Sequence, residues 1–315
     1  MSEKSRPVLD IAVGILRCEN EICLSLRQKH QSHADHWEFP GGKVEQGELI
    51  DTALKREFIE ELGVQTDNWQ PLITIPWEYE KVSVRLHVYQ SYDFVGTPYG
   101  KEGQRVRWFD QSELQGITFP DANKGILTAL ELGDKYAISG KFANAEDFSA
   151  KLNNVLNDGV KLIQLRAKGL DVAEVRKLAQ ENIGAVHKAG AKLMLNGTPE
   201  LLAQTQADGI QLASNQLFAY DTRPVAKDKL LGASTHNPEE IDQALKIGAD
   251  FILLSPVLPT QTHPDMEALG LDAFRELVAE IPVPVFALGG MKTELLNEAK
   301  NHGAQGIAAI SAFWR

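Results

Sequence analysis

The stretch GGKVEQGELIDTALKREFIEELGV, residues 41–64, decides the fold of the N-terminal half and raises the first question about it. Glu57, Glu60 and Glu61 lie in a segment of helical periodicity, although like charges three or four positions apart destabilise an isolated helix. At about 100° per residue, all three project from one side of that helix. A hard divalent cation such as Mg²⁺ prefers oxygen ligands and would convert this repulsion into binding. The triplet alone leaves two interpretations open, a metal site and a solvated acidic face.

The residues around the acids suit a helix that packs onto a sheet and supports a metal site. Its opposite side is apolar, with Ala53, Leu54, Phe58 and Leu62. Gly41 and Gly42 allow a backbone approach that side chains would block, so a glycine carbonyl can serve as a further ligand. The guanidinium group of Arg56 can pair with a carboxylate and fix its orientation.

The wider spacing of the stretch favours the metal site. It follows the pattern G-x5-E-x7-R-E-U-x-E-E-x-G-U, where U is aliphatic or aromatic, and so resembles the Nudix box. Every fixed position is filled, by Gly42, Glu48, Arg56, Glu57, Glu60, Glu61 and Gly63. The resemblance implies an α/β/α sandwich with a mixed sheet. It also implies hydrolysis of a nucleoside diphosphate linked to another moiety.

Further segments resemble the MutT-type Nudix hydrolases and extend the likeness over nearly all of residues 8–132. They are IAVGILR, WEFPGGKVEQGE, GKEGQ and FPDANKGI. The resemblance implies Mg²⁺, with Mn²⁺ as an alternative ion, held by the carbonyl of Gly41 and by Glu57, Glu60, Glu61 and Glu102. It gives Glu57 the task of helping to deprotonate the attacking water. Glu102 is the alternative base, because it lies in a separate loop, and Arg56 is expected to orient Glu57.

The same resemblance implies a nucleotide-base pocket. Asn123 corresponds to the residue that reads the purine edge, and its carboxamide offers both a donor and an acceptor for that purpose. Arg27 and Phe39 fall at matching pocket positions, with a surface arginine and a core phenylalanine as their alternative interpretations. The implied reaction converts 8-oxo-dGTP to 8-oxo-dGMP and pyrophosphate. It would cleanse the nucleotide pool of oxidised guanine and so avoid mutations.

From about residue 133 the sequence changes to short apolar runs that alternate with helical stretches. The eight runs are YAIS, LIQLRAK, KLMLNG, GIQLAS, LLGAST, FILLSPV, VFALGG and GIAAISAF. Eight strands with intervening helices over about 180 residues predict a (β/α)8 TIM barrel, with a doubly wound open sheet as the alternative. We therefore expect two α/β domains, residues 1–132 and 133–315.

The second half resembles thiamine-phosphate synthase and its relative TenI. The likeness is carried by QLRAK, LMLNG, DGIQLA, GASTHNPEE, GADFILLSPVLPTQTHP, PVFALGG and GAQGIAAISAFW. Gly289 and Gly290, at the end of a predicted strand, suit a backbone phosphate cup together with the segment near Ser311. Arg166 and Lys168 are expected to bind a diphosphate. Thr260 and Thr262 match family positions near a thiazole phosphate.

The barrel departs from this family at positions that normally help to hold Mg²⁺. Asn196-Gly197 stands where the synthase has Asn-Asp, and Gln216 replaces a second expected acid. The TenI tautomerase histidine is replaced by Pro256. Without those carboxylates, a Mg²⁺-dependent diphosphate substitution loses its main electrostatic support. We therefore expect a catalytically degenerate barrel that binds a thiamine-related phosphate or stabilises the chain, with an altered activity as the weaker alternative.

Composition sets limits on the remaining functions. The chain has 315 residues, a net charge of −11 and two cysteines, Cys18 and Cys23, which favours two soluble domains in a reducing cytoplasm. The acidic balance opposes binding to nucleic-acid polymers and anionic membranes. No apolar run approaches the roughly 18 residues of a membrane helix. The sequence does not predict the oligomeric state.

Two other functions remain open at this stage. In one, the Nudix domain hydrolyses a thiamine-related pyrophosphate and the barrel binds the product, an idea that the joining of the two domains suggests. In the other, the barrel is a sensor whose ligand controls the Nudix site, which requires coupling between the two binding equilibria.

Overall fold

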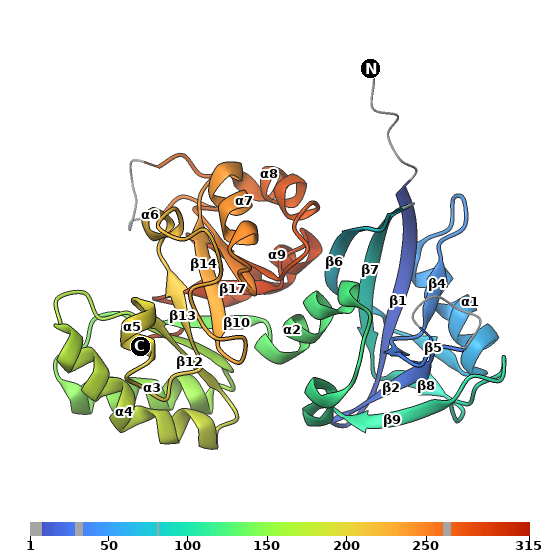
Figure 1. Cartoon of the computed structure of the whole chain (residues 1–315), viewed down its shortest axis with the longest axis horizontal. Coiled ribbons are helices and arrows are strands. Elements are labelled where there is room, and N and C mark those ends of the chain that lie inside the picture. The colour runs from blue at the N-terminus through green and yellow to red at the C-terminus, as the bar shows by residue number, and fades with distance from the viewer. Residues whose placement is uncertain (1–7, 29–33, 81, 261–265) are drawn as a thin grey trace. The chain divides into compact units, whose positions relative to one another are not determined.

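The computed structural model describes residues 8–28, 34–80, 82–260 and 266–315, and the chain forms two compact units (Figure 1). One unit comprises Met1–Ala129 with Ala279–Pro282, and the other comprises Leu130–Val278 with Val283–Arg315. No helix within the described ranges is long and apolar enough to cross a membrane.

The first unit is built on a mixed sheet, as predicted. The path β3-β2-β1-β7-β6 forms its centre, β4 adds to β1, and β9 adds to β2. β1 and β7 run parallel, whereas the other pairs in this sheet are antiparallel. The strands are β1 (Val8–Cys18), β2 (Glu21–Leu26), β3 (Trp37–Glu38), β4 (Gly41–Lys43), β6 (Gln70–Glu78), β7 (Ser83–Ser91) and β9 (Val106–Asp110). A separate pair joins β5 (Gln65–Asp67) to β8 (Asp93–Val95).

Helix α1 (Ile50–Leu62) packs on β1 through the apolar side that the sequence predicts. Its buried residues are Ala53, Leu54, Phe58 and Leu62, and they share one core cluster with Ala12 and Leu16 of β1. Gly63 ends the helix with φ 68°, a left-handed conformation that favours glycine. The packing of this side turns the other side of α1, with its acids, away from the core. A second helix, α2 (Lys124–Leu132), follows the segment that contains Asn123.

The second unit is a closed barrel of eight parallel strands, which confirms the predicted barrel and shows that the open-sheet alternative is wrong. The strands are β10 (Lys135–Ile138), β11 (Leu162–Leu165), β12 (Lys192–Asn196), β13 (Gly209–Leu212), β14 (Leu230–Thr235), β15 (Phe251–Leu254), β16 (Val285–Leu288) and β17 (Gly306–Ala309). β17 closes the ring by pairing with β10.

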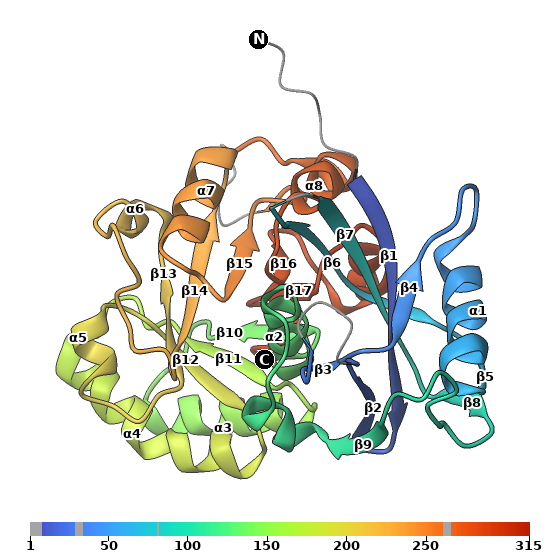
Figure 2. The same ribbon diagram turned by 45° about the vertical axis from the view of Figure 1, so that its right-hand side comes forward.

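Helices surround these strands, as Figure 2 shows. They are α3 (Ala145–Asn157), α4 (Val172–Lys188), α5 (Pro199–Leu202), α6 (Ser214–Leu217), α7 (Pro238–Lys246), α8 (Gly270–Val278) and α9 (Leu296–Asn301). Inside the ring, Tyr136 meets Phe251 and Phe286 with ring centroids 5.6 and 5.7 Å apart. The barrel interior is therefore a packed core, and the space for a ligand lies at its end.

Candidate functional site

The two glycines before α1 bring the backbone and an acidic side chain into close contact. Gly41 has φ 151° and pairs with Val13 of β1, and a Cβ atom there would lie 2.1 Å from the carbonyl oxygen of Ala12. A Cβ atom on Gly42 would lie 2.2 Å from Oε1 of Glu57. The Glu57 carboxylate therefore lies directly against the backbone of β4, and only glycine leaves room for it.

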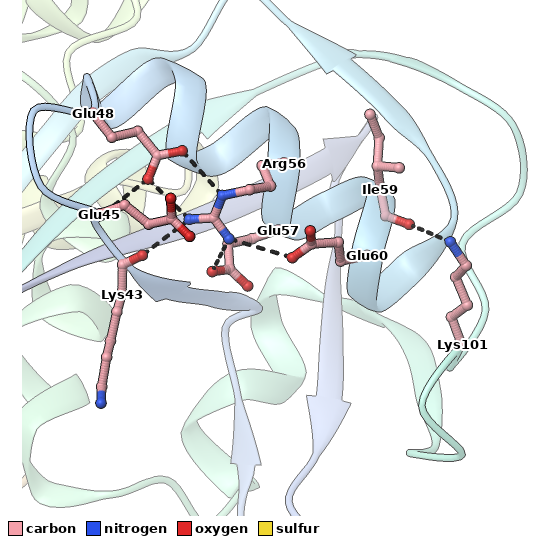
Figure 3. Close-up of polar contacts among 8 residues, drawn as sticks. All are labelled: Lys43, Glu45, Glu48, Arg56, Glu57, Ile59, Glu60 and Lys101. Atoms are coloured by element: carbon pink, nitrogen blue, oxygen red, sulfur yellow. Dashed lines mark hydrogen bonds and ion pairs between the residues drawn. The ribbon is translucent and has the colours of Figure 1, made fainter.

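Arg56 is the centre of a hydrogen-bond network that links the acids (Figure 3). Its Nε and Nη2 donate to Oε1 and Oε2 of Glu48 at 3.0 and 2.9 Å. Nη1 donates to Glu57 Oε1 at 2.7 Å and to Glu60 Oε2 at 3.3 Å, and Nη2 also donates to the carbonyl of Lys43 at 3.0 Å. Because the Glu48 pair is bidentate, the guanidinium plane is fixed, and Glu57 is held in one orientation.

Glu61 is a partly buried carboxylate among the predicted metal ligands. Burial first, and then the charges of Glu57, Glu38 and Glu102, raise its pKa to about 8, and a hydrogen bond from the Gly41 backbone opposes this shift. Four carboxylates from three segments of the chain are therefore near one another. Glu60 has a more exposed side chain, at 56%, than Glu57, at 13%.

Glu102 reaches this group from a loop that is anchored to the end of α1. The Lys101 backbone and the Gln104 side chain donate to the carbonyl of Glu61 at 2.9 and 3.1 Å. Nζ of Lys101 donates to the carbonyl of Ile59 at 3.1 Å (Figure 3). Gln104 Oε1 accepts from the backbone of Glu102 at 2.9 Å, which fixes the loop beside the acids.

This donor set fits a hard divalent cation, because it consists of carboxylate and carbonyl oxygens whose mutual repulsion a cation would relieve. Burial is the main cause of the raised pKa of Glu61, and repulsion from the neighbouring carboxylates adds to it. Within the described residues, no three His, Cys, Asp or Glu side chains converge into a ready metal site. Glu57, Glu61 and Glu102 are thus near one another without forming such a site. Glu57 and Glu60 are both paired with Arg56.

A second group of residues lies on the neighbouring segments and includes the predicted base pocket. Phe39 is buried and stacks on Phe119, with centroids 5.4 Å apart and planes at 16°. Asn123 is 9% exposed in the turn before α2, and its carboxamide has no hydrogen-bond partner among the described residues. Its backbone N–H donates to the carbonyl of Pro120 at 2.9 Å. The Asn123 side chain is therefore available to a ligand.

Arg27 forms an ion pair with Glu38, a residue that sequence reasoning missed. Burial raises the pKa of Glu38, and the Arg27 guanidinium opposes the shift. Tyr79 was also missed. Its pKa is raised by burial and by the charges of Glu38 and Asp121, so it lies near this ion pair. The only sequence signal for Glu38 was its position beside Phe39, and Tyr79 had no such signal.

The barrel contains a cavity of about 590 Å³ among the residues that end its strands. Three of the predicted barrel residues, Arg166, Gly289 and Gly290, line it, whereas Lys168 is exposed and does not. Thr260 lines the cavity, and Thr262 lies outside the described residues. Lys292, which the sequence reasoning missed, also lines it. The volume suits a small organic ligand.

The cavity has basic groups at two places on the strand ring. Arg166 follows β11, where its backbone N–H donates to Ser139 Oγ at 2.8 Å. Burial lowers the pKa of its guanidinium group, which has no hydrogen-bond or ion-pair partner among the described residues. Gly289 and Gly290 follow β16 with φ 93° and 67°, and Lys292 is close behind them. Cβ atoms on these glycines would lie 2.8 Å from Pro256 Cα and 2.7 Å from Leu258 Cβ.

Neither of the two positions where acids were expected carries one. Position 197 is a glycine, and the amide side chains of its neighbour Asn196 and of Gln216 are already hydrogen-bonded. Asn196 Oδ1 accepts from Gln164 Nε2 at 3.1 Å. Gln216 Oε1 accepts from the backbone of Ala213 at 3.0 Å and does not line the cavity. None of the described residues that line the cavity is Asp or Glu.

Two protein families match separate parts of this chain. Thiamine monophosphate synthase matches residues 135–313, and the NUDIX domain matches residues 12–129. A thiamine-phosphate synthase of Pyrococcus horikoshii is 31% identical over 163 residues, which cover 52% of this chain and 79% of that protein. A solved thiamine phosphate pyrophosphorylase from Pyrococcus furiosus is 26% identical, covers 58% of this chain and 88% of its own, and has a TM-score of 0.49. A solved MutT from Aliivibrio salmonicida or Vibrio cholerae is 32% identical, covers 38% and 94%, and has a TM-score of 0.33.

Proposed function

This chain belongs to the thiamine monophosphate synthase family and carries a Nudix hydrolase domain before the barrel, and from this premise we propose that the Nudix domain hydrolyses 8-oxo-dGTP. The products would be 8-oxo-dGMP and pyrophosphate. The observation that carries this choice of substrate is Asn123, whose buried carboxamide has no partner among the described residues. The carboxamide offers a donor and an acceptor side by side, and a purine edge would supply the matching acceptor and donor.

The residues of this domain divide the catalytic work between them. Gly41, Glu57, Glu60, Glu61 and Glu102 would hold Mg²⁺ or Mn²⁺. When bound, the ion would neutralise the phosphates and make water easier to deprotonate. Arg56 holds Glu57 through a bond of 2.7 Å, so that the carboxylate keeps a fixed direction for accepting a proton. Glu102 is the alternative base, because it lies in a separate loop and would approach from another side.

The substrate is tested by comparing kcat/KM for 8-oxo-dGTP, dGTP and thiamine pyrophosphate on one preparation with Mg²⁺. We expect a strong preference for 8-oxo-dGTP, and we expect Asn123→Ala to remove most of that preference over dGTP. Asn20→Ala is the matched control, because Asn20 is exposed and bonds to Asp110 at 2.8 Å. A preference for thiamine pyrophosphate would replace this substrate with the thiamine-related alternative and leave the Nudix chemistry intact.

For the barrel we propose binding of a small phosphorylated molecule without turnover. The observation in favour is Arg166, a partly buried cation that lines the cavity and has no partner among the described residues. A phosphate would supply the missing charge. If the barrel also acts as a sensor, thiamine monophosphate will change kcat/KM of the Nudix domain. Unchanged kinetics at saturating ligand would leave binding without regulation.

A further inference from the structure

We infer that the barrel cavity binds its organic phosphate without the divalent cation that its family resemblance implies. The inference rests on the proposal that the barrel binds a phosphorylated small molecule, and it adds how the charge of that phosphate is balanced. It follows from the groups that line the cavity and from how those groups are already bonded.

The described lining of the cavity carries basic side chains and no acidic one. The ionisable side chains among the described residues that line the cavity are Arg166, His236 and Lys292. Each is either cationic or neutral, so the described lining offers no negative charge to a metal ion. Mg²⁺ in proteins is held by one or two carboxylates together with waters and substrate phosphates. The cations of the described lining would repel such an ion, because no carboxylate among these residues offsets their charge.

The two positions at which the family has an acid are Gly197, which has no side chain, and Gln216. The amides of Gln216 and of Asn196, the neighbour of Gly197, are the remaining candidate ligands. Asn196 lines the cavity, but its oxygen already accepts from Gln164 at 3.1 Å. Gln216 is turned to the start of its own helix, where it accepts from Ala213 at 3.0 Å. Each amide oxygen keeps a second lone pair, but it lacks the negative charge of the carboxylate that Mg²⁺ normally takes as a ligand. The described residues around the cavity therefore do not fit the implied metal.

Basic side chains at the cavity take the place of the ion. Arg166 and Lys292 bring positive charge to the cavity from the ends of β11 and β16. Near Lys292, the left-handed turn at Gly289 and Gly290 lets the backbone approach a ligand closely. A guanidinium group binds a phosphate through two parallel hydrogen bonds, which supplies both charge and orientation.

His236 adds an imidazole ring whose Nδ1 is hydrogen-bonded to the backbone. Its Nδ1 lies 2.7 Å from the carbonyl oxygen of Ser255, which can only accept, so Nδ1 carries a proton. In the neutral ring, Nε2 is then an acceptor. The cavity thus offers cations for a phosphate and, on His236, an acceptor for an N–H or O–H group of the organic part. These groups select a phosphate monoester with a hydrogen-bond donor on its body.

The test is calorimetric titration of the full chain with thiamine monophosphate, once in EDTA and once in excess Mg²⁺. This probe is a monoester and contains no diphosphate linkage for the Nudix domain to cleave. We expect the two dissociation constants to agree within about twofold. We also expect Arg166→Gln to weaken binding at least about tenfold, the loss typical of one charged hydrogen bond. Arg176→Gln is the matched control, since Arg176 bonds to Gln204 and does not line the cavity.

A gain of metal dependence provides a second, independent readout. Asn196→Asp places a carboxylate in the cavity, and its affinity for the probe should rise when Mg²⁺ is added. Melting temperatures of all variants would establish that they are folded. Binding by the unaltered chain only with Mg²⁺, no binding at all, or binding unaffected by Arg166→Gln would overturn the inference. An Asn196→Asp chain that ignores Mg²⁺ would also contradict it. None of these results depends on 8-oxo-dGTP hydrolysis, so the two proposals can fail separately.

Discussion

Arg56 and Glu48 are joined by two parallel hydrogen bonds, from Nε to Oε1 at 3.0 Å and from Nη2 to Oε2 at 2.9 Å. The pair fixes the guanidinium plane, and this plane in turn directs Nη1 to Glu57. Glu48 lies eight residues before Arg56, outside the helix that bears the acids. It therefore connects the loop before α1 to the orientation of a catalytic candidate.

Arg56→Lys should impair catalysis although it keeps the charge. A lysine cannot contact both oxygens of Glu48 and also hold Glu57, so the carboxylate loses its fixed direction. We expect kcat to fall by about 10²-fold, the scale of a small misplacement of a catalytic group. Steady-state kinetics on 8-oxo-dGTP would measure this effect. Arg107→Lys, at an exposed arginine of β9, is the control, and equal activity of the two variants would refute this role for Arg56.

Glu57→Gln should abolish most turnover and leave the fold intact. Glutamine has nearly the same shape and fits beside Gly42, but it neither accepts a proton nor carries charge for a cation. We expect a loss of about 10²- to 10⁴-fold in kcat. The melting temperature should change little. Glu45→Gln, in the loop before the helix, should retain full activity, and near-normal turnover by the Glu57 variant would remove Glu57 from the catalytic centre.

Gly42→Ala should act on Glu57 by steric displacement alone. The added Cβ atom would lie 2.2 Å from the carboxylate, so one of the two groups must move. We expect a fall of about 10²-fold in kcat with a smaller effect on stability. Gly116→Ala is the control because a Cβ atom at that position meets nothing within 4 Å. Circular dichroism and kinetics on the same samples would separate misfolding from displacement.

The two cysteines should differ sharply in reactivity. Cys18 is exposed, while burial raises the pKa of the Cys23 thiol to about 12. Ellman's reagent should modify one thiol per folded chain and two after denaturation. The pKa of the Cys23 thiol is higher in the folded chain than its ordinary value of 9.0. The free energy of unfolding should therefore fall as the pH rises above that value. Denaturant unfolding of Cys23→Ala should show a smaller decline there, and an equal decline would contradict the expectation.

Removal of divalent ions should separate the two halves of the chain functionally. EDTA should stop hydrolysis of 8-oxo-dGTP, and either Mg²⁺ or Mn²⁺ should restore it, because the Nudix ligands are oxygens. Binding of thiamine monophosphate should persist under the same conditions. The two measurements on one sample test both expectations, and hydrolysis that continues in EDTA would contradict the metal requirement.

The sequence was most informative where one periodic segment carries both packing and chemistry. Ala53, Leu54, Phe58 and Leu62 are all buried, as helical spacing predicts, and this burial turns the acids away from the core. The barrel was equally accessible to prediction, because each strand is a short apolar run and its neighbours in sequence are its neighbours in the ring. Local periodicity was sufficient for both parts.

The pocket residues were harder to predict, because several segments meet there. Tyr79 directly follows β6, and Glu38 lies in the two-residue strand β3. Neither position belongs to a periodic sequence pattern. Lys292 follows the turn at Gly289 and Gly290, and the sequence gives no sign that this turn directs it to the cavity. The hydrogen bonds of the Asn196 and Gln216 side chains depend on the geometry of their partners. Such contacts follow from packing between segments, which a single sequence does not specify.

The pairing of β17 with β10 has a consequence for biosynthesis. Ile307 is the register partner of Lys135, so the seam of the barrel joins the last of its eight strands in sequence order with the first. One edge of β10 must wait for its partner until all the intervening barrel residues have left the ribosome. Contacts between segments so distant in sequence form slowly. Closure of the ring at this seam is therefore expected to be a late step in the folding of the barrel.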